Sequence, residues 1–321
     1  MNEMDTRFAN QYNIQWFPGH MTKTLRMMEQ EIQHVDASLV LLDARIPLSS
    51  LNPEIERITS GKPHLYIMNK ADLADPDITA QWLAYFKSAG AGCLPMNSKQ
   101  SGKAGAVKGP IEKELSALME RRRKKGMIGA RIRVMVVGIP NVGKSTFINS
   151  FAKKACAKTG NKPGVTKGKQ WIKVNPTLEL LDTPGILWPK FEDQSVGMKL
   201  AFIGSINDEI LIMQEMAVDL LMFLGREYPK LLEERYGFTY AELTAGSEAP
   251  EKGQDAHPEL TEEKNTAIAC LAQIARVRKC FDKGEALNYD KAAALLIDDF
   301  RSGRIGRITL EYPAEEGKHE S

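Results

Sequence analysis

The stretches Asn69-Lys70-Ala71-Asp72 and Gly138-Ile139-Pro140-Asn141-Val142-Gly143-Lys144-Ser145 decide the fold of this 321-residue chain. The second stretch follows an apolar run at residues 132–137 and precedes a helical pattern. A strand, then Gly-x-x-x-x-Gly-Lys-Ser, then a helix is the complete context of a phosphate-binding loop. The sequence therefore predicts a nucleotide site at residues 138–145, where the start of a helix favours anions.

Individual residues of this loop have predictable tasks. Lys144 is expected to reach the β- and γ-phosphates as a catalytic group, and the Ser145 hydroxyl is expected to ligate Mg²⁺. The residues whose backbone N–H groups are predicted to surround the α- and β-phosphates are Asn141, Val142, Gly143, Lys144, Ser145 and Thr146.

The first stretch ends an apolar run at residues 64–69 and has the pattern of a guanine reader. Asp72 can accept hydrogen bonds from guanine N1–H and the exocyclic amine, a pair that adenine does not offer. Asn69 is predicted to read the base edge, and the stem of Lys70 to cover the face of the base. In Asn97-Ser98-Lys99, the Ser98 N–H is predicted to donate to the guanine carbonyl, with Asn97 a further nucleotide-binding candidate.

Two further segments carry the expected magnesium and γ-phosphate contacts. In Asp182-Thr183-Pro184-Gly185, which follows a buried run, Asp182 is predicted to hold Mg²⁺ and the Gly185 N–H to sense the γ-phosphate. Thr166 is predicted to close onto Mg²⁺ when that phosphate is present. Thr159 is the nearest alternative, and the Pro-Gly-Val-Thr context favours Thr166.

The order of these motifs predicts a circular permutation. In most GTPases the phosphate loop comes first and the base reader last, whereas here the base reader comes first. Strands alternate with helices over residues 15–190, which predicts a doubly wound α/β domain with a mostly parallel sheet, a circularly permuted P-loop GTPase. Helical patterns then predict an all-α domain at 191–312, which the second switch would enter directly, and a solvated tail at 313–321.

Composition narrows the class of protein. With 43% hydrophobic residues the chain can bury one large core or two ordinary ones. No apolar run approaches the ~20 residues needed to cross a bilayer, and no secretory signal begins the chain. The four cysteines form no CxxC pair, which favours reduced thiols over disulfides or a zinc site. A cytoplasmic protein without membrane contact is expected.

The net charge of +2 conceals a strong asymmetry. Residues 99–173 hold nineteen Lys or Arg against three acidic residues, a net of +16, so the rest of the chain carries −14. The segment includes Arg121-Arg122-Arg123-Lys124-Lys125. One interpretation is a solvated helix end together with residues that bind the nucleotide's own phosphates, but one nucleotide cannot use so many cations. A polyanionic partner, nucleic acid, is the favoured interpretation.

Three stretches carry a resemblance to a known family. They are Trp16-Phe-Pro-Gly-His-Met21, the segment from Leu42-Asp-Ala-Arg-Ile-Pro to Asn52-Pro53, and the phosphate loop. Together with the permuted order, they make the chain resemble the bacterial ribosome biogenesis GTPase A family (RbgA, also called YlqF). The resemblance covers the whole GTPase domain, and the helical domain has the length that the family shows.

The resemblance implies a function. Members act in late assembly of the large ribosomal subunit, bind rRNA, and hydrolyse GTP faster on that subunit. We therefore expect a Mg²⁺-dependent GTPase that times its stay on the maturing large subunit and is a monomer when free. The candidate rRNA contacts in the helical domain are Arg276, Arg278, Lys279, Arg301, Arg304 and Arg307. A solvated helix face explains them equally well, because nearby acidic residues nearly balance them.

The resemblance also bears on catalysis. Ile186 stands where a Ras-like protein keeps its water-positioning glutamine, so the attacking water must be oriented by another group. His20 matches the histidine that the family is thought to use, although a residue beside Pro18-Gly19 could instead cap the first helix. Asn141 matches the asparagine that helps hold K⁺ in potassium-dependent GTPases, where the ion neutralises transition-state charge.

Two other classes of function remain open from sequence. One is a nucleotide-dependent signalling switch with a protein effector, which the basic segment disfavours. The other is a metabolic enzyme that uses GTP as phosphoryl donor, which would need a second substrate pocket for which no motif is found.

Overall fold

The computed structural model describes residues 14, 16–99, 131–152, 168–245, 261–283 and 285–313, with isolated residues at 113, 115–117, 120–121, 124–126 and 157. Thr166, Thr159, Arg122, Arg123 and most of the basic segment lie outside the described residues, as does most of the proposed tail.

The sheet domain contains these elements in chain order: α1 (Gly19–Glu31), η1 (Ile32–His34), β1 (Ala37–Asp43), α2 (Pro53–Thr59), β2 (His64–Asn69), α3 (Pro76–Ser88), β3 (Cys93–Met96), β4 (Ile132–Gly138), α5 (Lys144–Ala152), β5 (Gln170–Asn175), β6 (Leu178–Asp182) and α6 (Gln194–Phe202). The helical elements that follow are η2 (Asp208–Ile210), α7 (Met213–Glu227), α8 (Pro229–Tyr236), α9 (Tyr240–Ala245), α10 (Glu262–Val277) and α11 (Tyr289–Ser302).

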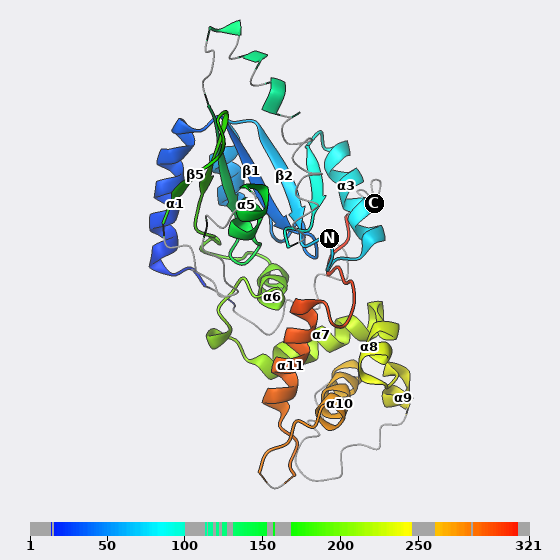
Figure 1. Cartoon of the computed structure of the whole chain (residues 1–321). Helices are drawn as coiled ribbons and strands as arrows, with labels where there is room; N and C mark the ends of the chain where they lie inside the picture. The colour runs from blue at the N-terminus through cyan, green and yellow to red at the C-terminus, as the bar shows by residue number, and fades with distance from the viewer. Residues whose placement is uncertain are drawn as a thin grey trace, which may run out of the picture. The chain divides into compact units, whose positions relative to one another are not determined.

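Six strands form one sheet in the order β3-β2-β1-β4-β6-β5 (Figure 1). All neighbours are parallel except β5 and β6, which pair as an antiparallel hairpin. Every residue of β1 is buried, as expected for a central strand covered on both faces. The predicted mostly parallel α/β sheet is confirmed, and β1 and β2 have the bounds that their apolar runs predict.

The strand order also explains why the sheet is doubly wound. The chain passes from β1 to β2 to β3 in one direction, and from β4 towards β6 in the other. Because crossovers between parallel strands are right-handed, α2 and α3 cover one face while α5 covers the opposite face. The direction reverses between β1 and β4, and ligands of such folds bind at the carboxyl ends of the strands beside this point.

Local sequence sets the helix starts that flank the sheet. The Asp75 side chain accepts hydrogen bonds from the backbone N–H groups of Asp77 and Ile78, and Pro76 occupies the first helical position of α3. Asn52 accepts from the Glu54 N–H in the same way at the start of α2. Both are standard N-caps, which satisfy N–H groups that have no partner within the helix.

The chain divides into two compact units. One comprises Tyr12–Asn207 with Thr309–Ser321, and the other contains Asp208–Ile308. The sequence predicts a division after residue 190, whereas α6, with its buried Met198, Leu200 and Phe202, groups with the sheet. A helix therefore intervenes in the chain between the second switch and the helical unit.

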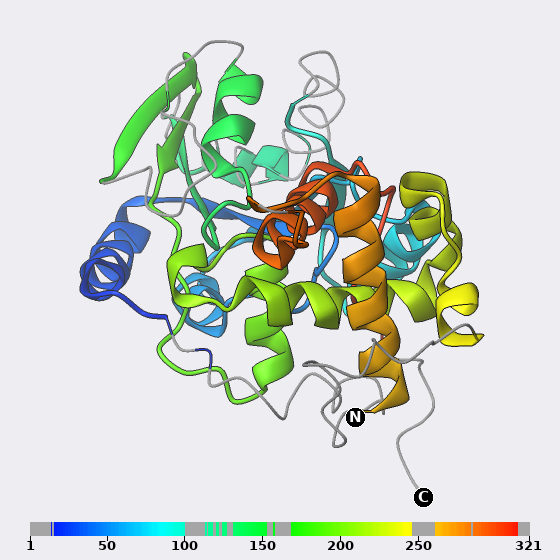
Figure 2. The same cartoon turned by 90° about the horizontal axis from the view of Figure 1, so that it is seen from below.

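The helical unit has its own core. Helices α10 and α11 pack against α7 and against each other (Figure 2). Leu221, Ile274 and Leu296 are fully buried there, one from each helix. The predicted C-terminal helical architecture is thus confirmed. Among the described residues, no helix has both the length and the apolarity to cross a membrane.

Candidate functional site

The sheet brings the nucleotide motifs to one edge. Asp43, Asn69, Gly138 and Asp182 are the last residues of β1, β2, β4 and β6, which all run in the same direction. The carboxyl ends of parallel strands meet at a common edge. Motifs that are far apart in sequence therefore converge around the point where the winding direction reverses.

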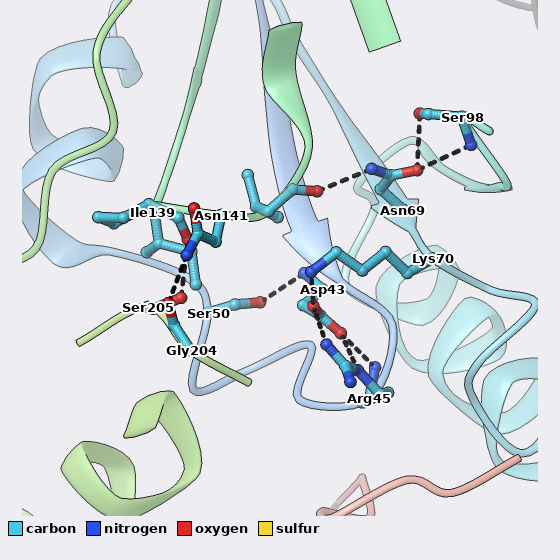
Figure 3. Close-up of polar contacts among 12 residues, drawn as sticks. Asp43, Arg45, Ser50, Asn69, Lys70, Ser98, Ile139, Asn141, Gly204 and Ser205 are labelled. Carbon is cyan, nitrogen blue, oxygen red and sulfur yellow. Dashed lines mark hydrogen bonds and ion pairs between the residues drawn. The ribbon is translucent and has the colours of Figure 1, made fainter. Parts of the chain in front are cut away.

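Asn69 connects the base-reading loop with the phosphate loop. Its Nδ2 donates to the carbonyl oxygen of Val142 at 2.7 Å, and its Oδ1 accepts from the Ser98 Oγ at 2.7 Å and the Ser98 N–H at 3.2 Å (Figure 3). The side chain is 2% exposed. The sequence suggests that Asn69 reads the base edge and that the Ser98 N–H meets the base, but in this structure the two residues bond to each other. Asn69 therefore acts here as a joint between three loops.

The Asn69 side chain lies too close to Gly143 for any larger residue to fit there. A Cβ on Gly143 would lie 2.4 Å from Asn69 Nδ2, and its φ of +98° disfavours other residues. Gly185 is similarly confined, since a Cβ there would lie 2.6 Å from the Cα of Pro140. The candidate γ-phosphate sensor is thus in backbone contact with the phosphate loop.

Lys144 is folded back onto its own loop. Its Nζ donates to the carbonyl oxygens of Gly138 at 3.1 Å and Ile139 at 2.7 Å. Burial lowers the pKa of Lys144 to about 8, against the opposing attraction of Asp182. Carbonyl dipoles only partly compensate a buried cation, so phosphate oxygens would be stronger partners for this ammonium group.

Two of the three residues predicted for Mg²⁺, Ser145 and Asp182, lie together. Ser145 Oγ donates to Asp182 Oδ2 at 3.1 Å, which joins the start of α5 to the end of β6. Asp182 is 1% exposed. Its Oδ1 has no hydrogen-bond partner among the described residues. Burial raises the pKa of this carboxyl. A buried oxygen pair with an unfilled acceptor suits a hard divalent cation, so the donor set fits Mg²⁺.

The Lys70 side chain is held by an ion-pair cluster whose other members, Asp43 and Arg45, lie outside the guanine-reading motif. Its Nζ lies 3.0 Å from Asp43 Oδ2, and the guanidinium of Arg45 binds the same carboxylate through Nε and Nη2, each at 2.9 Å (Figure 3). Asp43 is fully buried, and although burial opposes ionisation, the cations Arg45 and Lys70 hold its pKa well below the usual range. Burial lowers the pKa of Lys70. The stretch Asp43-Ala44-Arg45, which begins at the last residue of β1, is the sequence signal for this cluster.

Comparison with known proteins identifies the family. A model described as "50S ribosome-binding GTPase" matches residues 133–236. Ribosome biogenesis GTPase A of Bacillus cereus is 42% identical over 305 residues, which cover 95% of this chain and 96% of the relative. The same protein of Priestia megaterium is 43% identical over 303 residues, with 94% and 98% covered. This chain belongs to the ribosome biogenesis GTPase A family.

A solved structure supports the fold of this family member. GNP-bound YlqF from T. maritima superimposes with a TM-score of 0.58 at 23% identity, covering 91% of this chain and 99% of that one. The predicted family and the circularly permuted GTPase fold are therefore confirmed. As a GTPase of this family, the chain takes GTP as its substrate.

Other predicted site residues of this GTPase occupy the same edge or its surroundings. Asp72 follows Lys70 in a partly exposed turn after β2. The Asn97 Oδ1 accepts from the Lys99 N–H at 2.9 Å and so shapes its own turn. Asn141, the candidate K⁺ ligand, has a φ of +57° and donates from Nδ2 to the carbonyl oxygen of Gly204 at 2.6 Å (Figure 3).

The structure bears on the two interpretations of His20. The side chain is exposed in the first turn of α1, and its backbone carbonyl accepts from Thr24 Oγ1 at 3.0 Å. Pro18 is the N-cap of α1 and makes no side-chain capping bond. Both the catalytic and the capping interpretation of His20 stay predictions for this GTPase.

Ile186 is fully buried, and its backbone is held from another element. Asn52 Nδ2 donates to the Ile186 carbonyl oxygen at 2.9 Å. Sequence reasoning missed Asn52 as a partner of the second switch, because a residue that caps α2 gives no local sign of a contact with residue 186.

Several arginines of the helical unit are already paired. Arg301 binds Asp208 through two contacts of 2.7 Å. Asp299 accepts from Arg235 Nε at 2.8 Å and from Arg304 Nε at 2.5 Å. Arg278 lies over the Tyr236 ring at 5.3 Å. These contacts orient the cations within the helical unit.

Proposed function

We propose that this GTPase binds Mg²⁺·GTP at the carboxyl edge of its sheet and uses hydrolysis to time its stay on a maturing large ribosomal subunit. The observation that carries the nucleotide site is the Asn69 joint, which holds the guanine-reading turn against the phosphate loop. In a GTPase the base and the phosphates must be held at a fixed separation, and this side chain spans both loops.

The proposed roles follow from the contacts. Asp72 accepts from guanine, and the stem of Lys70, held by Asp43, covers the face of the base. On binding, Lys144 exchanges the Gly138 and Ile139 carbonyls for phosphate oxygens. Ser145 and Asp182 would hold Mg²⁺, which neutralises charge on the phosphates. Thr166 and Gly185 would order around the γ-phosphate.

Hydrolysis in this proposal does not use a glutamine. Ile186 is buried, so another group orients the water. His20 is proposed as that group, in the conformation adopted on the ribosomal subunit. Asn141, whose Nδ2 donates to the Gly204 carbonyl oxygen, is proposed to help hold K⁺.

Action in ribosome assembly rests on the relatives and on charge. The relatives from Bacillus cereus and Priestia megaterium are named ribosome biogenesis GTPase A, and a family model carries the description "50S ribosome-binding GTPase". The net +16 of residues 99–173 suits rRNA. The helical unit, residues 208–308, is proposed to bind RNA and the ribosome. A cytoplasmic location and a monomeric free state complete the proposal.

Co-sedimentation with ribosomal subunits tests the proposal. The protein should pellet with the large subunit in the presence of a non-hydrolysable GTP analogue and be released with GDP. Binding should weaken steeply with salt, by about 0.9 log units per log unit of salt for each duplex phosphate neutralised. Replacing Arg121, Arg122 and Arg123 with Ala should flatten that slope without changing GTP affinity. Equal binding of the large subunit with the GTP analogue and with GDP would refute the proposal that the bound nucleotide controls release.

A further inference from the structure

The chain returns to the sheet unit after its helical part. The Leu310 N–H donates to the Arg45 carbonyl oxygen at 2.8 Å, and Thr309 Oγ1 accepts from the Asp75 N–H at 3.1 Å. Trp82 Nε1 of α3 donates to the Glu311 carbonyl oxygen at 3.1 Å. In Figure 1 this red segment runs alongside α3. Residues 309–311 are thus fastened by backbone and side-chain bonds, and all three are buried.

The Glu311 carboxylate is bound by a loop of the sheet unit. Its Oε1 accepts from the Leu48 N–H at 2.5 Å and the Ser49 N–H at 3.0 Å, and its Oε2 accepts from Ser49 Oγ at 2.5 Å. Lys199 Nζ of α6 lies 3.5 Å from Oε2. Hydrogen bonds to an ionised acceptor are roughly twice as strong as neutral ones, so this carboxylate restrains the loop strongly.

That loop, residues 44–52, supports the base-reading side of the nucleotide site. Arg45 grips Asp43, which in turn holds Lys70. Ser50 Oγ accepts from the Asp43 N–H at 3.0 Å. The Leu310 N–H binds the carbonyl of Arg45 itself. A shift of the loop would therefore move the carboxylate that fixes the Lys70 side chain.

The same 44–52 loop also supports the second switch. Asn52, at its far end, donates to the Ile186 carbonyl oxygen directly after the γ-phosphate sensor Gly185. Asn52 is 1% exposed and simultaneously caps α2. The loop is consequently bonded to both the base reader and the γ-phosphate side.

We propose that Glu311 is a positioning residue of the nucleotide site, which holds the 44–52 loop so that Lys70 and Ile186 keep the arrangement needed to bind guanine nucleotides. The proposal rests on the nucleotide site argued above and adds a distant residue to it. Loss of the charge weakens the bonds from the Leu48 and Ser49 N–H groups. The 44–52 loop, which carries Arg45 and Asn52, is then held less firmly, so nucleotide binding weakens at two places.

The test compares full-length wild type with Glu311→Gln, which keeps the shape but not the charge. Equilibrium binding of fluorescent GDP and of a GTP analogue should weaken by roughly fivefold or more, the lower bound of typical coupling between sites. The KM for GTP should rise, while kcat at saturation changes less. Binding of GDP to the wild-type protein tests the nucleotide site by itself. Failure of the proposed nucleotide site can therefore be distinguished from failure of the positioning role of Glu311.

Thermal unfolding distinguishes positioning from simple fold stabilisation. The rise in Tm that GDP produces depends on its Kd, so that rise should be smaller in Glu311→Gln than in wild type. Ser49→Ala removes one bond to Oε2 and should show a smaller change in the same direction, even if the first variant folds poorly. Glu234→Gln, on the exposed face of α8, is the matched control. Wild-type GDP affinity in both Glu311→Gln and Ser49→Ala would overturn the proposal, whatever their Tm without ligand.

Discussion

The Nδ2 of Asn69 lies 2.7 Å from the carbonyl oxygen of Val142, so the guanine-reading turn and the phosphate loop are hydrogen-bonded to each other. Asn69 ends β2 and Val142 lies in the loop between β4 and α5, so residues distant in sequence meet at one edge of the sheet. Gly143 leaves the space that this contact requires. The two loops are therefore brought together in the fold although the order of the motifs is permuted.

Asn69→Ala should weaken binding of GDP and GTP together. The change removes one donor to Val142 and leaves Ser98 without its partner in a buried place. Buried groups that lose a partner cost about 1–3 kcal/mol each, so a loss of roughly tenfold or more in affinity is expected. Fluorescent-nucleotide titration measures it, with Asn265→Ala on α10 as the control. A variant with unchanged affinity would show that the joint is dispensable.

Asp72→Asn should change the preferred base. The carboxylate accepts from guanine, whereas an amide can donate to the 2-oxo group of xanthine. Affinity for GDP should fall and affinity for xanthosine diphosphate should rise, as measured by competition titration. Asp77→Asn in the exposed first turn of α3 should leave the preference unaltered. Unaltered guanine preference in Asp72→Asn would remove residues 69–72 from the base site.

Asp182→Asn should separate stability from magnesium binding. Burial raises the pKa of Asp182, and a raised carboxyl pKa gives stability at low pH that is lost as pH rises through the folded-state value. Ionised Asp182 therefore costs stability at neutral pH when Mg²⁺ is absent. Without ligands the variant should melt at or above the wild-type Tm at pH 7.5.

The same Asp182→Asn variant should lose the difference in GTP affinity that wild type shows with and without Mg²⁺. Glu192→Gln, exposed before α6, should change neither property. Lower stability combined with intact magnesium dependence would contradict the assignment of Asp182 as a ligand.

Nucleotide affinity should depend on the ionisation of Lys144. Burial lowers its pKa to about 8 in the free protein. Binding to phosphate requires the ammonium form, so affinity should fall as pH rises above that value, by up to about tenfold per unit. Calorimetric titration with GDP between pH 7 and 9.5 measures the slope. Lys144→Met should bind GDP weakly, and its affinity should not change with pH. Equal GDP affinity of the wild type at pH 7 and pH 9.5 would disprove the role of Lys144 in phosphate binding.

His20→Ala should slow hydrolysis on the large subunit without affecting nucleotide affinity. A lost general acid or base typically costs about 10²-fold or more in turnover. His34→Ala, also exposed and close in sequence, is the control. Replacing K⁺ with Na⁺ should slow wild-type turnover if Asn141 helps hold the ion. Phosphate release at saturating GTP is the measurement, and normal turnover in His20→Ala would exclude catalysis by this residue.

Local patterns were sufficient for most of the fold. The runs at β1 and β2 are continuous and apolar because both faces of these strands are covered, and their bounds were predictable. Asp75 followed by Pro76 marks the start of α3 for the same local reason. By contrast, the boundary between the two units was not apparent from sequence. The pattern of α6 predicts a helix whether it packs on the sheet or in the helical unit.

The sequence by itself determined the motifs and their permuted order, since a phosphate loop depends on glycines, a lysine and a hydroxyl within a few residues. Only the tertiary structure decided what holds those motifs. These contacts are the hydrogen bond from Asn69 to Val142, the ion pairs of Asp43 with Arg45 and Lys70, and the hydrogen bond from Ser49 to Glu311. Buried polar side chains need hydrogen-bond partners within the protein because water is excluded. Which partners are within reach depends on which strands and loops become neighbours in the folded chain.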